Sequence, residues 1–149
     1  MKAFVLSAAV LVLATAAAAA PKPLDLRLVV DCAPGAPTVP YAHQGVNEGL
    51  CLAPDIIVGR ADIKDAQVIT TGYGDEAARL TISDEAVGRL TAATSANVGK
   101  RIAVVYDGHV IFAPVVRDPI TGNQLEITVG STGDSVEDFV ADLNGPPTP

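Results

Sequence analysis

Apolar and polar residues alternate along several short segments of the chain, a period typical of half-buried β-strands. Leu24, Leu26 and Leu28, for example, alternate with Asp25 and Arg27. The pattern predicts strands at residues 24–30, 55–58, 67–71, 77–82, 102–106, 110–112 and 125–129. Asp107-Gly108 separates two of these apolar runs, and an Asp-Gly pair in that position predicts a tight hairpin.

Two other segments carry apolar residues at helical spacing. Ser83 is a predicted N-cap followed by two acidic residues, and this helix should end at residues 97–99, with Gly99 in a left-handed conformation. Ser135 begins a second helix with an apolar stripe at Val136, Phe139, Val140 and Leu143. Strands and helices in mixed order predict a single small α+β domain. We expect a mainly antiparallel sheet with both helices packed on one face.

The first residues have the order of a secretory signal peptide. A positive start at Met1-Lys2 precedes the apolar stretch 3–13 and the small residues 16–20, which favours cleavage after Ala19. A membrane anchor is the alternative, but a span needs about 20 apolar residues, and 21–23 reads Pro-Lys-Pro. We therefore expect residues 1–19 to be removed. The mature chain is expected to be soluble, without a membrane span, and periplasmic or extracellular.

The charge of the chain narrows the choice of partners. It carries 17 acidic and 10 basic residues, for a formal net charge of −7. Such a chain is repelled by phosphate backbones and by anionic lipid surfaces. Nucleic acid is therefore not an expected partner.

Cys32 and Cys51 are the two cysteines of the chain. An even count in an oxidising compartment predicts one disulfide, which would close the Pro- and Gly-rich segment 33–49, itself predicted to be a loop. Loop closure of this length stabilises a fold by about 3 kcal/mol. A metal site that includes His43 is a second interpretation, although zinc needs three or four ligands. Free thiols are a third.

No arrangement of residues predicts catalysis. The two histidines, His43 and His109, lack neighbouring catalytic partners in the sequence, and His109 follows the predicted hairpin turn. No nucleophile elbow, phosphate loop or zinc motif occurs. The acidic pairs at 84–85 and 137–138 each begin a predicted helix, where capping and the helix dipole account for them. The sequence therefore predicts no catalytic residues, no metal and no cofactor, and a protein that is not an enzyme.

One series of motifs is distinctive in its order and spacing. It comprises Leu52-Ala53-Pro54, residues 59–66 (GRADIKDA), 96–101 (ANVGKR), 105–108 (VYDG), Ala113-Pro114 and 119–122 (PITG). Together these resemble the periplasmic head subdomain of SecD, the accessory membrane subunit of the bacterial protein-export translocase. The resemblance extends over about residues 51–143. Together with the predicted signal peptide and disulfide, it divides the chain into a signal peptide at 1–19, a strand and disulfide-closed loop at 20–50, a SecD-head-like domain at 51–144 and a flexible tail at 145–149.

The resemblance implies a binding role. It implies contact with unfolded or extended polypeptide, or with an envelope or translocase protein, and it brings no catalytic residue with it. The transmembrane helices of SecD and its proton-linked movement have no counterpart in this chain. The cysteine loop before residue 51 is not part of the pattern that we can match.

The polar loop 117–124, together with the adjacent strand ends, is the candidate binding surface, because loops on a rigid scaffold commonly carry contacts. Its candidate residues are Arg117, Asp118, Ile120 and Asn123. Prolines within and before the loop would lower the cost of ordering it on binding. A loop that merely connects two strands is the alternative. At the level of the whole chain, the alternatives are a secreted envelope protein with an unrelated binding role and a small hydrolase.

Overall fold

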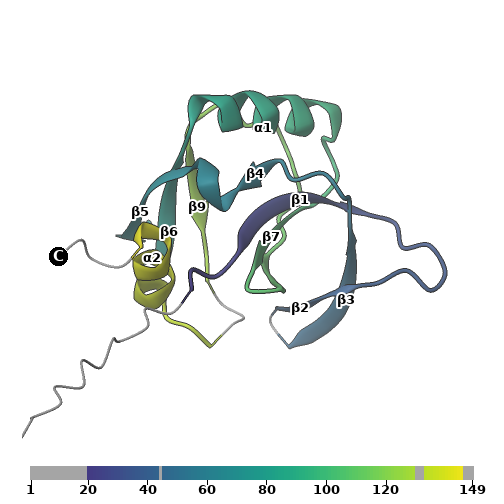
Figure 1. Ribbon diagram of the computed structural model, residues 1–149, viewed down its shortest axis with the longest axis horizontal. Coiled ribbons are helices and arrows are strands. Elements are labelled where there is room, and N and C mark those ends of the chain that lie inside the picture. The colour runs from purple at the N-terminus through teal and green to yellow at the C-terminus, as the bar shows by residue number, and fades with distance from the viewer. Residues whose placement is uncertain (1–19, 44, 130–132, 146–149) are drawn as a thin grey trace, which may run out of the picture.

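The computed structural model describes residues 20–43, 45–129 and 133–145 (Figure 1). The predicted signal peptide and all of the predicted tail except Gly145 lie outside these residues. The elements follow the chain in this order: β1 (Leu24–Val30), β2 (Val39–His43), β3 (Val46–Leu52), β4 (Val58–Gly59), the 3₁₀ turn η1 (Arg60–Asp62), β5 (Ile63–Thr70), β6 (Glu76–Ile82), α1 (Asp84–Ala96), β7 (Ile102–Tyr106), β8 (His109–Phe112), β9 (Gln124–Ile127) and α2 (Val136–Asn144).

Most strands of the described chain form a sheet that closes on itself. Its order is β3-β2-β8-β7-β1-β4, and an additional pairing of β1 with β3 completes a barrel-like ring. The closing pairs are Val29↔Leu52 and Val30↔Cys51. β2 and β8 pair in parallel at Tyr41↔Val110, whereas the other pairings are antiparallel. Closure protects the edges of a sheet from unwanted pairing.

The remaining strands of the described chain form a second antiparallel sheet in the order β5-β6-β9. Helix α2 packs against β5 and β6, and α1 lies across the end of the molecule drawn uppermost in Figure 1. The expected α+β composition, with two helices in the described chain, is confirmed. The expected single sheet covered on one face is wrong in part, because the strands divide between a closed sheet and an open one.

The predicted loop at 33–49 is also wrong in part, because it contains β2 and the beginning of β3. Pro40 and Gly49 face each other across this strand pair. Gly49 allows a close approach, since a Cβ added there would lie 2.6 Å from Thr38 Oγ1. The two residue types that suggested a loop are therefore accommodated within a strand pair.

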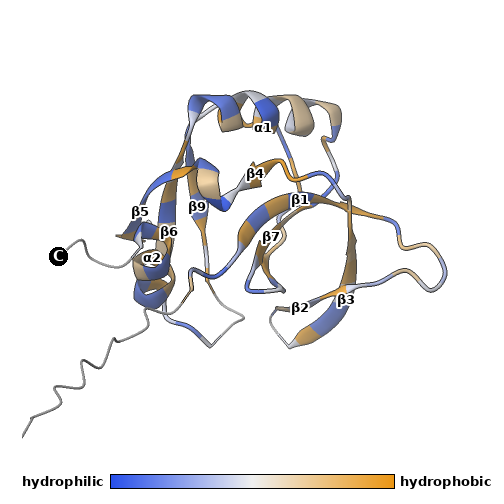
Figure 2. Cartoon of the chain, viewed as in Figure 1, coloured by the Kyte–Doolittle hydropathy of each residue, from blue (hydrophilic) through white to orange (hydrophobic). Residues whose placement is uncertain are grey.

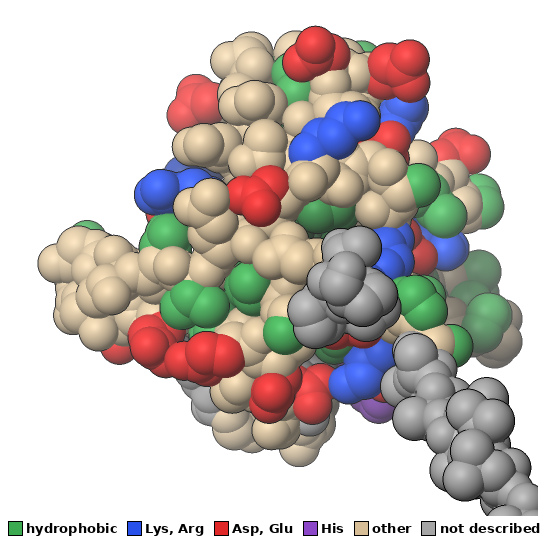
Figure 3. Space-filling view, turned by 60° about the vertical axis from the view of Figure 1, so that its left-hand side comes forward, with side chains coloured by type: hydrophobic (Ala, Val, Ile, Leu, Met, Phe, Trp, Pro, Cys, Tyr) green, Lys and Arg blue, Asp and Glu red, His purple; other side chains and the backbone are tan. Residues whose placement is uncertain are grey.

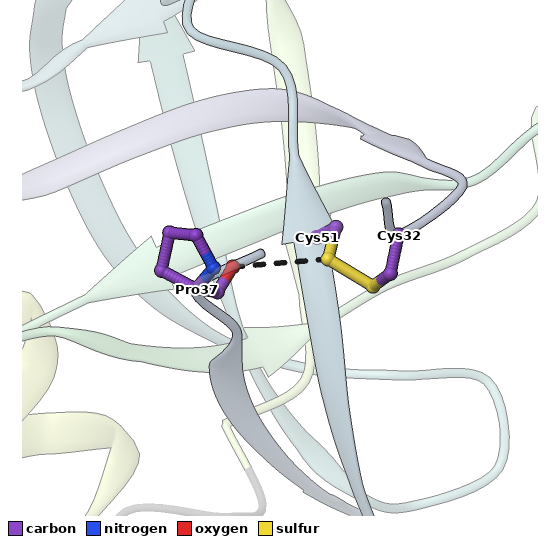
Figure 4. Close-up of a disulfide and its surroundings, with 3 residues drawn as sticks. All are labelled: Cys32, Pro37 and Cys51. Atoms are coloured by element: carbon purple, nitrogen blue, oxygen red, sulfur yellow. Dashed lines mark hydrogen bonds between the residues drawn. A yellow bond between two sulfur atoms is a disulfide. The ribbon is translucent and has the colours of Figure 1, made fainter. Parts of the chain in front are cut away.

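The predicted disulfide between Cys32 and Cys51 is present (Figure 4). Cys51 Sγ lies 3.7 Å from the carbonyl oxygen of Pro37. The bond follows the end of β1 and joins it to β3 beside the pairs that close the ring. Both cysteines are thus engaged with each other, which contradicts the metal-site and free-thiol interpretations.

Several local predictions are confirmed. Asp107 and Gly108 have φ values of 49° and 79°, the left-handed pair that a type I′ hairpin requires between β7 and β8. Ser83 Oγ accepts a hydrogen bond from Ala86 N, and Ser135 Oγ accepts one from Asp138 N. α1 ends at Ala96 with Asn97 as its C-cap, at the beginning of the predicted end 97–99.

Strand β7 lies between two apolar cores and contributes residues to both. All five of its residues are buried. Ile102, Val104 and Tyr106 belong to the main core between the two sheets and the helices, whereas Ala103 and Val105 belong to a smaller cluster with Tyr41. β1 shows the more usual alternation of hydrophobic and hydrophilic positions (Figure 2). A strand buried on both faces needs apolar residues at every position, and IAVVY supplies them.

Candidate functional site

A groove with a volume of about 400 Å³ opens between the barrel, α1 and β9. Most of its lining residues are apolar. They are Leu26, Leu90, Ile102, Val104, Phe112, Pro114, Val115, Val116, Arg117, Asp118, Ile120, Gln124, Leu125, Glu126 and Ile127. Ligand pockets in proteins commonly have volumes of about 300–1,000 Å³, so the groove lies at the lower end of that range.

The floor and the rim of the groove differ in exposure. Floor residues such as Leu90 and Ile102 belong to the main core and are buried. Phe112 and Ile120 are half-buried, and Val115 on the rim is 52% exposed. Apolar surface that belongs to the core therefore continues into a rim that solvent reaches. A continuous apolar surface of this kind is typical of a binding site.

Helix α1 holds the loop at one side of the groove. Thr94 is fully buried, and its Oγ1 accepts a hydrogen bond of 2.9 Å from Ile120 N while donating one of 2.7 Å to Leu90 O. Thr91 Oγ1 donates a 2.7 Å hydrogen bond to Ile120 O. Both backbone groups of Ile120 are thus fixed by threonines of one helix. The side chain of Ile120 is presented to the groove by a rigid support.

The two ends of the same loop are tied to neighbouring segments. Before the loop, Val116 N donates to Lys100 O, and Val116 O accepts from Gly99 N, both at 2.8 Å. After the loop, Asn123 O accepts a 2.9 Å hydrogen bond from Ile82 N. These bonds, with those to Ile120, order the loop before any ligand arrives. A preordered loop lowers the entropic cost of binding.

The structure brings together three of the four residues expected in a binding surface. Arg117 and Asp118 are exposed at the groove, and Ile120 contributes half-buried apolar surface. Asn123 is exposed but does not line the groove.

Sequence reasoning included the strand ends beside the loop but named none of their residues as candidates. It did not identify β9 as the opposite side of the groove, or Phe112 and Val115 as apolar lining residues. The polar–apolar alternation at 124–127 was a sign of a half-buried strand. It carried no information about which neighbour the strand would face.

A cluster of polar residues holds α2 but does not line the groove. Asp142 Oδ2 accepts hydrogen bonds from Arg60 Nη1 at 2.7 Å and from the Tyr106 hydroxyl at 3.0 Å. Burial raises the pKa of the Asp142 carboxyl, but the hydrogen bonds from Arg60 and Tyr106 outweigh burial, so its pKa lies below the usual value. Burial, and then Asp142, raise the pKa of Tyr106 far above its usual value. The cluster therefore favours an ionised Asp142 and a neutral Tyr106.

The histidines lie elsewhere. His43 stacks on Tyr41 with ring centroids 5.9 Å apart, and His109 Nδ1 lies 2.9 Å from Asp107 O. Neither lines the groove. Within the described ranges of the chain, no group of three or more His, Cys, Asp or Glu residues could hold a metal ion.

The surface carries charges of both signs. On the face drawn in Figure 3, acidic side chains recur among basic and hydrophobic ones. At the groove, Arg117 lies beside Asp118, and Glu126 pairs with Arg79 at 2.8 Å. The rim thus combines opposite charges around an apolar floor.

The fold and the groove define a class of protein: a small α+β domain in which a barrel-like sheet and a second sheet enclose an apolar groove. The family model of the SecDF P1 head subdomain matches residues 38–146. The chain belongs to this family, as its motifs suggested. The match begins before residue 51, where the motif resemblance starts, and so includes β2 and β3.

Curated relatives are subunits of the protein translocase. The chain is 40% identical over 76 residues to SecDF of Thermus thermophilus, covering 51% of this chain and 10% of the relative. It is 34% identical over 107 residues to SecD of Acetobacter pasteurianus, covering 71% of this chain and 20% of the relative. The chain thus spans a fifth or less of the length of these relatives.

Solved structures agree with this assignment. One, of SecDF as a membrane component that enhances protein export, has a TM-score of 0.64 and 25% identity, over 83% of this chain and 62% of the other. SecDF in a super-membrane-facing form has a TM-score of 0.62 and 27% identity, over 83% and 18%. In the part of the present chain that the structure describes, no helix has the length and apolar character needed to cross a bilayer.

Proposed function

We propose that this chain is a periplasmic, non-catalytic module that binds unfolded or extended polypeptide during protein export, and that the groove beside β9 is the binding site. The observation that carries the proposal is the apolar groove with its preordered loop. Membership of a family whose relatives are translocase subunits supports the same role. The periplasmic location rests on the predicted signal peptide. N-terminal sequencing of the exported protein should then begin at Ala20.

The size of the groove implies weak and transient binding. Burying one leucine-sized side chain contributes about 1.5–3 kcal/mol, whereas association itself costs about 4–15 kcal/mol. A groove of about 400 Å³ takes few side chains, so the net affinity should be modest. We expect a Kd of roughly 10 µM to 1 mM, which corresponds to about 4–7 kcal/mol of binding free energy. Weak binding suits a site past which a polypeptide has to move.

The test is a titration of a fluorescently labelled secretory protein that is held unfolded by reduction and alkylation. The site variant changes Arg117, Asp118 and Ile120 to Ala. A matched control changes Lys64, Asp55 and Val68 to Ala as well. These three residues are exposed and do not line the groove. We expect binding to weaken at least fivefold in the site variant and to change less than twofold in the control.

Two results would contradict the proposal. One is an absence of binding to the unfolded protein at concentrations up to the millimolar range. The other is an equal effect of the site and control variants while both keep the native circular dichroism spectrum. Hydrolysis or another turnover of the polypeptide would instead favour the enzyme alternative.

A further inference from the structure

We propose that extended polypeptide enters the groove by adding as a new strand to the outer edge of β9. This inference rests on the proposed function and specifies how the ligand is recognised. The β5-β6-β9 sheet has two outer edges, one on β5 and one on β9. These two edges differ in whether their outward backbone groups have hydrogen-bond partners in the described chain.

The edge on β5 is covered. Asn144, the last residue of α2, accepts a 3.0 Å hydrogen bond from Ala66 N through Oδ1 and donates one of 2.9 Å to Ala66 O through Nδ2. A side-chain amide has a donor and an acceptor, so it satisfies a strand residue as a neighbouring strand would. This edge is therefore not available for pairing at Ala66.

The edge on β9 has outward-facing backbone groups. Asn123 O accepts from Ile82 N, which places this pair at a hydrogen-bonded position of the ladder. The alternation of an antiparallel ladder then directs the backbone N–H and C=O groups of Leu125 and Ile127 toward β6. The N–H and C=O groups of Gln124 and Glu126 consequently point away from β6. Among the residues that the structure describes, none makes a hydrogen bond to these groups.

The groove lies along this edge. All four residues of β9 line it, although successive residues of a strand point to opposite faces of the sheet. A pocket on one face of the sheet would contact alternate residues, so contact with all four places the groove beside the strand. In Figure 1, β9 is the strand of its sheet nearest to the barrel.

The chemistry of this arrangement selects an extended backbone. Two outward N–H groups and two outward C=O groups at alternate positions match another strand, and peptide recognition by strand addition uses such groups. Phe112, Val115 and Ile120 across the groove offer apolar contacts to alternate side chains of the ligand. Backbone pairing is independent of sequence, so many polypeptides can bind provided that they are unfolded.

The decisive probe is a set of three fluorescent peptides of eight residues in which Leu and Val alternate with Ser and Thr. One is unmodified, one is N-methylated at every apolar residue and one at every polar residue. In an added strand, alternate residues direct their N–H groups toward β9 and the others away from it. N-methylation of one set should therefore weaken binding at least tenfold, whereas N-methylation of the other set should change it less than threefold.

The outcomes separate the two proposals. A difference between the two methylated peptides supports strand addition. Equal binding of the modified peptides, whether strong or weak, overturns strand addition but leaves a groove that binds side chains if the unmodified peptide still binds. Failure of all peptides and of the unfolded secretory protein overturns the proposed function itself.

A variant provides a second measurement. Glu126→Pro removes an outward N–H and no hydrogen bond to β6, and proline is tolerated on edge strands. Glu126→Ala is the matched control, because it removes the ion pair with Arg79 but keeps the N–H. We expect Glu126→Pro to bind the unmodified peptide at least fivefold more weakly than Glu126→Ala does, because the two variants differ in the outward N–H. Equal effects in folded variants would overturn the inference, and the methylated peptides decide the question if Glu126→Pro does not fold.

Discussion

The junction between α2 and the barrel allows a quantitative test of how the described fold is held together. The perturbation is Asp142→Asn, which removes a charge and changes the size of the side chain little. Asp142 is 23% exposed and lies between Arg60 and the Tyr106 hydroxyl. We expect the substitution to weaken the attachment of α2 and to lower the free energy of unfolding.

The magnitude follows from the bonds that are lost. A hydrogen bond to a charged group contributes about 1.5–3 kcal/mol, but the partial exposure of this pair reduces its contribution, because solvent screens ion pairs. The substituted asparagine side chain would also retain an oxygen that accepts from Tyr106. We therefore expect a loss of about 1–2 kcal/mol at neutral pH. Asp55→Asn, on an exposed carboxylate, is the control and should change stability by less than about 0.5 kcal/mol.

The assay is urea unfolding followed by circular dichroism, within a double-mutant cycle with Tyr106→Phe. Tyr106 is 1% exposed, and its ring packs edge-on against Phe139 with centroids 4.8 Å apart. Phenylalanine keeps this packing and removes the hydroxyl. We expect a coupling energy of about 0.5–1.5 kcal/mol between Asp142 and Tyr106, as found for residues that share a hydrogen bond.

The pH dependence of the stability difference between Asp142→Asn and the wild type can refute this reasoning. The pKa of Asp142 is lowered in the folded state, so the carboxylate stabilises the fold above its unfolded pKa of about 3.9, and this contribution is lost as the pH falls through the folded value. The difference between Asp142→Asn and the wild type should therefore shrink below pH 4. A difference that is constant from pH 7 to pH 3, or a coupling energy of zero, would show that the charge does not hold the junction.

Three further predictions concern stability. Replacing Cys32 and Cys51 together by Ser should lower the free energy of unfolding in urea by about 3 kcal/mol, because the released loop gains entropy in the unfolded chain. Reductant should lower the stability of the wild type but not that of the variant. Gly88→Ala should raise stability by about 1 kcal/mol, because Gly88 is an exposed residue inside α1 with open space at its Cβ. Gly108→Ala should lower stability by about 1–2 kcal/mol, since φ is 79° there. In thermal unfolding, Gly88→Ala should raise the melting temperature and Gly108→Ala should lower it. Changes in the same direction would contradict the argument.

The features that the sequence predicted correctly depend on few neighbouring residues. The hairpin at Asp107-Gly108 requires two left-handed residues, and the helix starts at Ser83 and Ser135 require an oxygen near the first free amides. The disulfide depended on the count of cysteines and the expected compartment. The motif series was enough for the family resemblance, because turn residues at fixed spacings are local signals that can be read from one sequence.

The candidate site was predictable in part. A polar loop between two strands indicated residues 117–124, and three of its four candidate residues line the groove. The opposite side of the groove, formed by β9, could not be derived from the sequence. Alternation within a strand tells which residues are half-buried, but it does not tell which edge remains without a partner.

The tertiary structure decided how the strands pair. β1 pairs with β7 along most of its length and with β4 and β3 at its two ends, and the last of these pairings closes the barrel. In the same way, Asn144 covers one sheet edge at a residue 78 positions away, which leaves β9 as the edge beside the groove. The sequence by itself determined both helix starts, most of the strands and the hairpin turn, because these depend on residues close together in the chain, whereas β2 and the beginning of β3 were predicted as a loop. The closed barrel, the open edge and the groove between them depend on contacts between distant residues, whose energies no local pattern contains.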